Sequence, residues 1–431
     1  MKNIRRLTIK NLGPIKNCEI DLSKMMVLDG PQAAGKSTIA KAIFFFRTVK
    51  NSLTNLFFSS EGWSDPVVIQ SAQYALLQKL RRIFDLNIWN DDTVLAFEYN
   101  PDVKIEITRG KTTLHNVIKN FDGHLIKFSD SITNCLFEQM KNEKFSKSKT
   151  KIEKEFELLF EDNQEIVYIP AGRSMLSILS ESLSHIFFNF DDSQKNMIDY
   201  CTTDYINRVT KVKPTFKTIE GSYSFEENFK MDTFTLSFIQ EKMWQILQGK
   251  YKYLNGEEFL QLFLKGDKKD VQIKFASSGQ QEVLWILNLI YYYLMRQKST
   301  CFIIEEPEAH LYPNTQKEIA EYITMALAEN NECVLTTHSP YILGTLSNLL
   351  DAQRLMDEGY NISSLLKKEN LTSAQLLRHS DFSAYFVDNG TLQNAVDEDN
   401  GLIKNELIDG ASDKINGFAD DLMYLEREGK S

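Results

Sequence analysis

Alternating apolar and polar residues mark four short segments in the first quarter of the chain. Ile4–Ile9 and Cys18–Leu22 stand on either side of one turn, and Thr93–Tyr99 and Val103–Thr108 stand on either side of another. A period of two residues is typical of strands that bury one face and expose the other. The pattern therefore predicts two β-hairpins.

Elsewhere, short apolar runs show no alternation, as expected of strands that are buried on both faces of a parallel sheet. These runs are Met25–Leu28, Glu165–Pro170, Cys301–Ile304 and Cys333–Thr336. Segments with the three-to-four spacing of helices lie between them. The predicted helical segments are Thr38–Val49, Asn51–Asn90, Val283–Met295 and Pro313–Ala328. Buried strands that alternate with helices predict an α/β fold, here with a mixed sheet.

The order of these elements predicts one α/β domain that is interrupted by a largely helical insertion. We expect its N-terminal part at 1–50, a helical segment at 51–92, a β-hairpin at 93–120, a mainly helical insertion at 121–264 whose strand 165–170 returns to the core, its C-terminal part at 265–345, and a helical and hairpin tail at 346–431.

Composition narrows the class of protein. The chain has 431 residues, of which 42% are hydrophobic and 25% charged, as in globular proteins. A net charge of −10 argues against a surface that coats nucleic acid, although a local basic groove stays open. The lysine-rich stretch Lys141–Lys154 is the candidate for such a contact, and a solvated helix or linker is the alternative.

Several absences point to the cytoplasm. The five cysteines form no C-x-x-C pair, which fits reduced thiols. The first residues lack the apolar core of a signal peptide, and no apolar run reaches the roughly 18 residues of a membrane span. We expect a cytoplasmic chain that makes no contact with a membrane.

Gly30–Ser37 fits the pattern G-x-x-x-x-G-K-[ST] between a predicted strand and a predicted helix. In that position the backbone N–H groups of the loop and the helix dipole face the phosphates of a nucleotide. Lys36 would reach the β- and γ-phosphates, and Ser37 would ligate Mg²⁺. The residues expected to bind the nucleotide are Gly30, Pro31, Gln32, Ala33, Ala34, Gly35, Lys36, Ser37 and Thr38.

Two further strands end in residues that suit chemistry at a phosphate. Cys301–Ile304 is followed by Glu305 and Glu306, and Cys333–Thr336 is followed by Thr337 and His338. The helix between these strands makes one βαβ unit, so both ends should emerge at the same edge of the sheet as the phosphate loop. Acids there can hold Mg²⁺ and orient a water molecule.

Two other segments are candidates for the same site. Val271–Phe275 is predicted as a strand, and Ser277, Ser278, Gly279 and Gln280 then open an apolar helix, where serine and glycine serve either as a second anion site or as a helix cap. Arg173 follows the strand 165–170 and either faces a ligand or forms a structural salt bridge.

Taken together, the phosphate loop, Ser-Ser-Gly-Gln-Gln, Ile-Ile-Glu-Glu-Pro-Glu and Thr-Thr-His-Ser-Pro resemble the ABC-type ATPases of the SMC, RecF and OLD kind. These proteins are often labelled AAA family ATPases in bacteria. The resemblance covers roughly 1–50, 93–110 and 265–345, and it extends to ATPase subunits of antiphage defence systems such as PARIS, Septu and Gabija.

The resemblance implies an ATPase that uses ATP and Mg²⁺. By that likeness 30–38 is the Walker A loop, 277–280 the signature loop, Glu305 the Walker B acid that helps hold Mg²⁺, Glu306 the catalytic glutamate and His338 the switch histidine. It further implies a homodimer or larger homo-oligomer, in which Ser277 and Gly279 contact ATP held by the other copy.

Three departures from the family pattern stand out. Glu305 replaces the usual aspartate, as in the OLD-like branch, and Ala33-Ala34 replace a glycine-serine pair, which predicts tighter loop dihedrals. The glutamine that normally couples Mg²⁺ to the insertion has no clear counterpart, and Arg173 or a glutamine near position 73 is the candidate.

Three functions remain open from the sequence. The first is an ATPase sensor and scaffold that controls a separate effector, such as a nuclease or other toxin, in antiphage defence, because the tail carries no nuclease motif. The second is a RecF- or SMC-like ATPase that acts in DNA repair or on DNA. A transporter subunit is the third, and it is disfavoured because too many residues separate Lys36 from Ser277.

Overall fold

The computed structural model describes residues 5–59, 65–109, 124–142, 149–178, 199–216, 218–219, 222–223, 233–263, 268–327, 330–408 and 410. Residues 143–148 of the lysine-rich stretch, and 409 and 411–431 of the predicted tail, lie outside this part. Within it, no helix is both long and apolar enough to span a bilayer.

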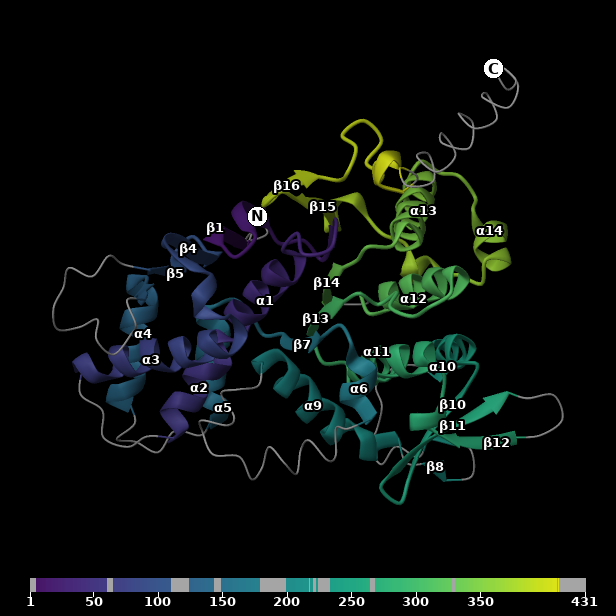
Figure 1. The fold of residues 1–431 in the computed structure, drawn as a ribbon, viewed down its shortest axis with the longest axis horizontal. Coiled ribbons are helices and arrows are strands. Elements are labelled where there is room, and N and C mark those ends of the chain that lie inside the picture. Colours follow the sequence, from purple (N-terminus) through teal and green to yellow (C-terminus); the bar gives the residue numbers. More distant parts are fainter. Residues whose placement is uncertain are drawn as a thin grey trace, which may run out of the picture.

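A six-stranded sheet forms the centre of the molecule, with the strand order β16-β15-β3-β14-β13-β7 (Figure 1). All neighbours in it are parallel except β15 and β16, so the sheet is mixed and the predicted α/β fold is confirmed. Its strands are β3 (Met25–Asp29), β7 (Glu165–Ile169), β13 (Thr300–Glu305), β14 (Glu332–Thr336), β15 (Phe382–Asp388) and β16 (Thr391–Asn394).

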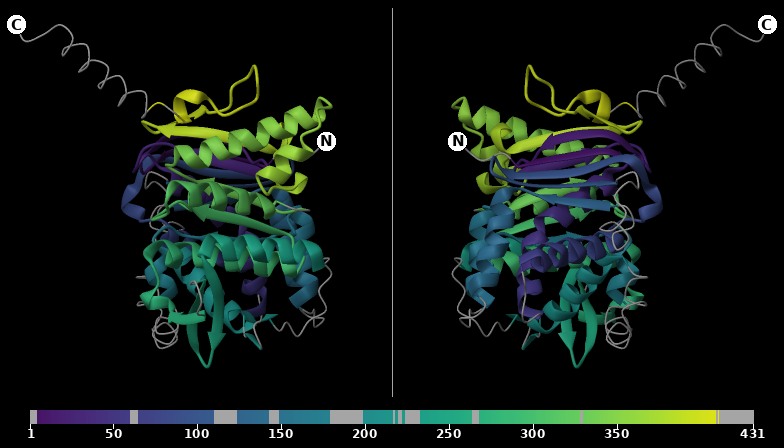
Figure 2. Two further views of the ribbon diagram at one scale, coloured as in Figure 1. Left: turned by 90° about the vertical axis from the view of Figure 1, so that its right-hand side faces the viewer. Right: turned by 90° about the vertical axis from the view of Figure 1, so that its left-hand side faces the viewer.

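The expected C-terminal tail contributes two of these strands. β15 runs parallel to β3, with Phe382 opposite Met25 and Tyr385 opposite Leu28. Figure 2 shows the yellow C-terminal strands beside the purple N-terminal ones, and the backbone N–H of Lys16 donates to the Gly390 carbonyl at 2.8 Å. The hairpin expected in the tail is therefore present, and it completes the central sheet, a place that the sequence did not predict.

A second sheet is antiparallel, with the order β2-β1-β4-β5-β6. Both predicted hairpins are confirmed within it, and β6 adds a strand at its edge. Its strands are β1 (Arg6–Leu12), β2 (Ile15–Asp21), β4 (Trp89–Asn100), β5 (Val103–Arg109) and β6 (His124–Phe128).

The helices differ from the predicted segments mainly at their ends. α1 stops at Arg47 and α2 begins at Val49, so the segment predicted as Thr38–Val49 starts and ends two residues early. The helices are α1 (Lys36–Arg47), α2 (Val49–Ser59), α3 (Asp65–Ile83), α4 (Asp130–Asn142), α5 (Lys149–Leu159), α6 (Arg173–Ile178), α9 (Tyr200–Val212), α10 (Thr233–Leu247), α11 (Ser278–Met295), α12 (Pro313–Met325), α13 (Pro340–Asp357) and α14 (Ser363–Lys368).

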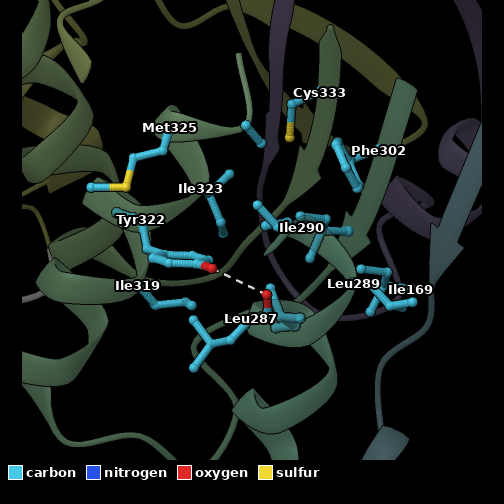
Figure 3. Packing of buried hydrophobic residues seen from close by; sticks show 14 of the residues in the cluster. Ile169, Leu287, Leu289, Ile290, Phe302, Ile319, Tyr322, Ile323, Met325 and Cys333 are labelled. Carbon is cyan, nitrogen blue, oxygen red and sulfur yellow. Dashed lines mark hydrogen bonds between the residues drawn. The ribbon is translucent and has the colours of Figure 1, made fainter. Parts of the chain in front are cut away.

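The central sheet separates two hydrophobic cores. Met26 and Leu28 of β3 point into a core that is shared with α1, α3 and the antiparallel sheet. Met25 and Val27 point into the other core, which is shared with α10, α11, α12 and α13. Burial on both faces explains why these strands have no polar alternation. Figure 3 shows the second core, where the Tyr322 hydroxyl donates to the Leu287 carbonyl at 3.1 Å.

A three-stranded sheet stands at one end of the molecule, at the lower right of Figure 1. It comprises β10 (Gly249–Leu254), β11 (Glu257–Phe263) and β12 (Lys268–Gln272), and a short pair, β8 (Thr218–Ile219) and β9 (Ser222–Tyr223), precedes it. Helices α4, α5, α6, α9 and α10 nevertheless take up more of the described part of 121–264 than the strands there do. The strand predicted at Val271–Phe275 is present in part, because β12 ends at Gln272. The backbone N–H of Ala276 then donates to the Ile273 carbonyl and closes a 3₁₀ turn before α11.

Candidate functional site

The phosphate loop joins β3 to α1 at the carboxyl edge of the central sheet. Gly30 has a φ of 140°, and a Cβ there would lie 2.1 Å from the Val387 carbonyl oxygen of β15. Gly35 caps α1 with a φ of 110°. Ala33 also has a positive φ, 62°, which an alanine adopts only under strain. The loop thus keeps a left-handed turn at the alanine that departs from the family pattern.

Lys36 lies across this loop and is buried. Its Nζ donates to the carbonyl oxygens of Gly30 at 2.6 Å and Pro31 at 2.9 Å, and lies 3.2 Å from Nδ1 of His338. Burial lowers the pKa of Lys36, and the nearby carboxylates of Asp29 and Glu306 act in the opposite direction. Ser37 and Thr38 follow in the first turn of α1, where Ser37 is exposed and Thr38 is half-buried.

Glu306 and His338 meet beside the lysine. Nε2 of His338 lies 3.0 Å from Oε1 of Glu306, so the contacts form a chain from Lys36 through His338 to Glu306. Strand order explains this meeting, because β3, β14 and β13 are adjacent and parallel. Glu306 has a φ of 43°, and its backbone N–H donates to the Thr336 carbonyl at 2.9 Å.

Glu308 is a site residue that the sequence analysis missed. Its Oε1 accepts hydrogen bonds from the Thr337 hydroxyl at 2.8 Å and from the backbone N–H of His338 at 2.6 Å. These bonds fix the peptide that carries the His338 ring. The signal was present in the sequence, since Glu308 is the third acid of Glu-Glu-Pro-Glu.

Glu305 ends β13 with a buried carboxylate. Its Oε1 has no hydrogen-bond partner in the described part of the chain, and its Oε2 lies 3.4 Å from the backbone nitrogen of Ala171. A buried carboxylate oxygen without a partner is costly unless a cation binds it. The described residues include no cluster of three or more His, Cys, Asp or Glu that could hold a metal by itself. Glu305 and Ser37 therefore fit Mg²⁺ that arrives with phosphate oxygens as further ligands.

The candidate signature loop stands apart from these residues. The side chain of Ser277 accepts from the backbone N–H of Gln280 at 3.3 Å, and Oε1 of Gln280 accepts from the backbone N–H of Ser277 at 3.1 Å, which makes a capping box at the start of α11. Ser277 and Ser278 are exposed. Within the described residues, no hydrogen bond joins 277–280 to 30–38, and the side chain of Gln280 donates instead to the Leu247 carbonyl at 2.8 Å.

The two candidates for the missing glutamine lie elsewhere. Arg173 is fully buried and binds backbone carbonyls, including those of Glu305 and Glu306, rather than facing open space. Gln73 of α3 donates to the Ile126 carbonyl of β6, in the antiparallel sheet. Of the two alternatives for Arg173, the structure favours the structural one, and its ion pair with Glu282 measures 3.5 Å.

Comparisons with known proteins complete the description. No curated protein matches the chain. An SMC head bound to the C-terminal winged-helix domain of ScpA is 11% identical, with a TM-score of 0.40, and the match covers 80% of this chain and 91% of that one. An SMC head domain from Thermotoga maritima is 9% identical, with a TM-score of 0.37 and coverage of 80% and 92%. An SMC head domain with an extended coiled coil, bound to the ScpA C-terminal domain from Pyrococcus furiosus, is 13% identical, with a TM-score of 0.39 and coverage of 91% and 96%.

A family model for the AAA ATPase domain matches residues 1–343, a span that contains the phosphate loop, Glu305, Glu306 and His338. Because this match covers most of the chain, the protein belongs to the family of AAA ATPase domains.

Proposed function

We propose that the chain binds and hydrolyses ATP with Mg²⁺. The observation that carries this proposal is the line of contacts from Lys36 through His338 to Glu306, beside the unpartnered buried oxygen of Glu305. A cation donor, a switchable imidazole and two acids then surround the end of a phosphate loop. This arrangement suits transfer of a phosphoryl group to water.

Each side chain has a separable role in this proposal. The loop amides and the N-terminus of α1 bind the phosphates, and Lys36 exchanges its bonds to the Gly30 and Pro31 carbonyls for phosphate oxygens. Ser37 and Glu305 hold Mg²⁺, which offsets the charge that develops on the transferred group. Glu306 orients the attacking water, and His338 holds the Glu306 carboxylate in place.

We further propose that two copies of the chain enclose ATP. Ser277 and Ser278 are exposed, and their loop is held by a capping box at the start of α11, with no hydrogen bond to the phosphate loop among the described residues. A second copy would bring its Ser277 and Gly279 to the phosphates, so hydrolysis would require at least a dimer. ATP binding then becomes a switch between open and closed pairs.

What this switch controls is proposed from the family likeness. The hairpin of the expected tail is built into the central sheet, and the carbonyl of Val387 lies against Gly30 of the phosphate loop, so a change at the loop could reach this hairpin. We propose that this ATPase acts as a sensor and scaffold for a separate effector protein, and that the setting is antiphage defence.

Phosphate release by the purified chain tests the enzymatic proposal. We expect hydrolysis that needs Mg²⁺ and is reduced at least about 100-fold in Lys36→Ala and Glu306→Gln. Glu306→Gln should retain ATP and become dimeric with ATP and Mg²⁺ by light scattering. A wild-type chain without affinity for ATP would refute the proposal, and turnover stimulated by duplex DNA would instead favour the DNA-associated alternative.

A further inference from the structure

Arg173 makes contacts that neither the phosphate loop nor the acids account for. Its guanidinium is fully buried where β7 leaves the central sheet. Its Nη1 donates to the carbonyls of Pro170 at 3.0 Å and Glu305 at 2.8 Å, and its Nη2 donates to the Glu306 carbonyl at 3.0 Å. One side chain therefore holds the backbone of both acids.

Strand pairing explains why these carbonyls need a side chain. The pairing of β13 with β7 ends at Ile304 and Ile169. Beyond that point β14 still pairs with Glu305 on one side of β13, but β7 has turned away on the other, so no strand is left on the β7 side to bind the carbonyls there. A buried carbonyl needs a donor, and the planar fork of arginine supplies several donors in fixed directions.

The same guanidinium also holds α11. Nε of Arg173 donates to the backbone carbonyl of Glu282 at 2.8 Å and lies 3.5 Å from Oε2 of its carboxylate, which is 1% exposed. Oε1 of Glu282 accepts from the backbone N–H of Ser174 at 3.3 Å. Glu282 stands five residues after Ser277, in the second turn of the helix that the signature loop opens.

We propose that Arg173 is a positioning residue that sets the Glu306 backbone according to the position of α11. The inference rests on the ATPase function proposed above. Glu306 has a left-handed φ of 43°, which costs energy and persists only where neighbours hold it. When a second copy pulls on the signature loop, α11 moves Glu282, Arg173 transmits the shift to the carbonyls of Glu305 and Glu306, and the carboxylate that orients water is brought into line.

The test compares Arg173→Lys with a matched control, Arg47→Lys. Arg47 is also fully buried and paired with a buried acid, Asp162, but it bonds residues at the opposite edge of the sheet. For each variant we would measure kcat and KM for ATP, the Kd of a non-hydrolysable ATP analogue, and the melting temperature. Lysine keeps the charge, but its three donors sit on one nitrogen and cannot replace the guanidinium fork that binds four carbonyls.

We expect Arg173→Lys to lower kcat about 10- to 100-fold with the analogue Kd changed less than twofold, since outer partners of reacting groups act on orientation rather than on binding. Arg47→Lys should lower the melting temperature and keep kcat. A folded Arg173→Lys with wild-type kcat would overturn the inference. So would a loss of kcat in both variants that is in proportion to their loss of melting temperature.

Glu282→Gln carries the same test if Arg173→Lys does not fold, because it keeps every atom of Arg173 and removes one charge. A fall in kcat with unchanged analogue affinity supports the inference, and wild-type kcat contradicts it. The proposed ATPase function and the proposed role of Arg173 can be refuted by different results. A wild-type chain that binds no ATP removes both, whereas a wild-type chain that hydrolyses ATP no faster than Arg173→Lys removes this one alone.

Discussion

A buried charge cluster lies at the amino edge of the central sheet, and replacing its acid gives a sharp prediction. Asp162 is 1% exposed and accepts from Nε of Arg47 at 2.6 Å and from Nη2 at 3.2 Å, while Nζ of Lys50 lies 3.2 Å from Oδ1. These two cations hold the pKa of the Asp162 carboxyl well below its usual range, although burial acts in the opposite direction.

Asp162→Asn would leave Arg47 and Lys50 buried beside a neutral amide. Breaking a buried pair in this way costs about 3–5 kcal/mol. Arg47 keeps its ion pair with Glu332 at 2.7 Å, so we expect a loss near the lower end of this range, about 3 kcal/mol. Asp351→Asn is the matched control. Asp351 pairs with Arg354 at 2.7 Å, but both side chains are 37% exposed, so its loss should cost less than about 1 kcal/mol.

The sign of the pH dependence follows from the depressed pKa. The carboxylate stabilises the fold fully above the unfolded pKa of about 3.9, and this stability is lost as the pH falls toward the folded pKa. The difference in free energy of unfolding between wild type and Asp162→Asn should therefore be about 1 kcal/mol smaller at pH 3 than at pH 7. Urea denaturation at both pH values measures it. A gap that is absent at pH 7, or wider at pH 3, would refute the reasoning.

Two further predictions concern the site. Gly30→Ala should reduce both nucleotide affinity and melting temperature, because its Cβ would meet the Val387 carbonyl at 2.1 Å, whereas Gly359→Ala, with a positive φ but open space around it, should cost only about 1–2 kcal/mol. Equal losses in the two variants, by thermal shift and analogue binding, would exclude the contact with β15 as the cause. Glu308→Ala should lower kcat about tenfold by releasing His338, and Glu308→Gln, which keeps the Oε1 acceptor, should retain most of the activity. If the two Glu308 variants have the same kcat in steady-state assays, Glu308 does not act through these hydrogen bonds.

The sequence pattern predicted the structure correctly where the environment of a residue depends on its immediate neighbours in the chain. The apolar run Cys301–Ile304 had to be buried on both faces, and β13 is. The glycines and the lysine of the phosphate loop could be placed because the spacing of the motif itself sets which of them face a phosphate. The ends of β13 and β14 could be placed together because one crossover helix joins them.

Pairing between distant segments could not be predicted in the same way. The residue pattern of Phe382–Val387 is that of a strand, but this pattern does not say with which strand it pairs. Its partner, β3, lies more than 350 residues earlier in the chain. Phe275 continues the alternation of β12 and is nevertheless 72% exposed, because the chain turns to begin α11. For Arg173 the sequence left a ligand-facing role and a structural role open. The choice between them depends on whether the side chain is buried, and this depends on where β7 ends relative to β13.

The geometry divides the proposed active centre into two parts that differ in how firmly they are held. Glu306 and His338 follow two adjacent parallel strands, β13 and β14, and Lys36 begins the helix after the neighbouring strand β3, so the ladder hydrogen bonds of the sheet set the spacing of the three segments. On the fourth strand, β7, pairing stops before the acids are reached, and there the Arg173 side chain replaces the ladder. Because the same side chain also binds Glu282 of α11, we expect movement of the candidate signature loop to reach Glu306 through this edge of the sheet. It follows that nucleotide binding, which depends on β3 and α1, should be separable by mutation from the orientation of Glu306, which depends on Arg173 and Glu282.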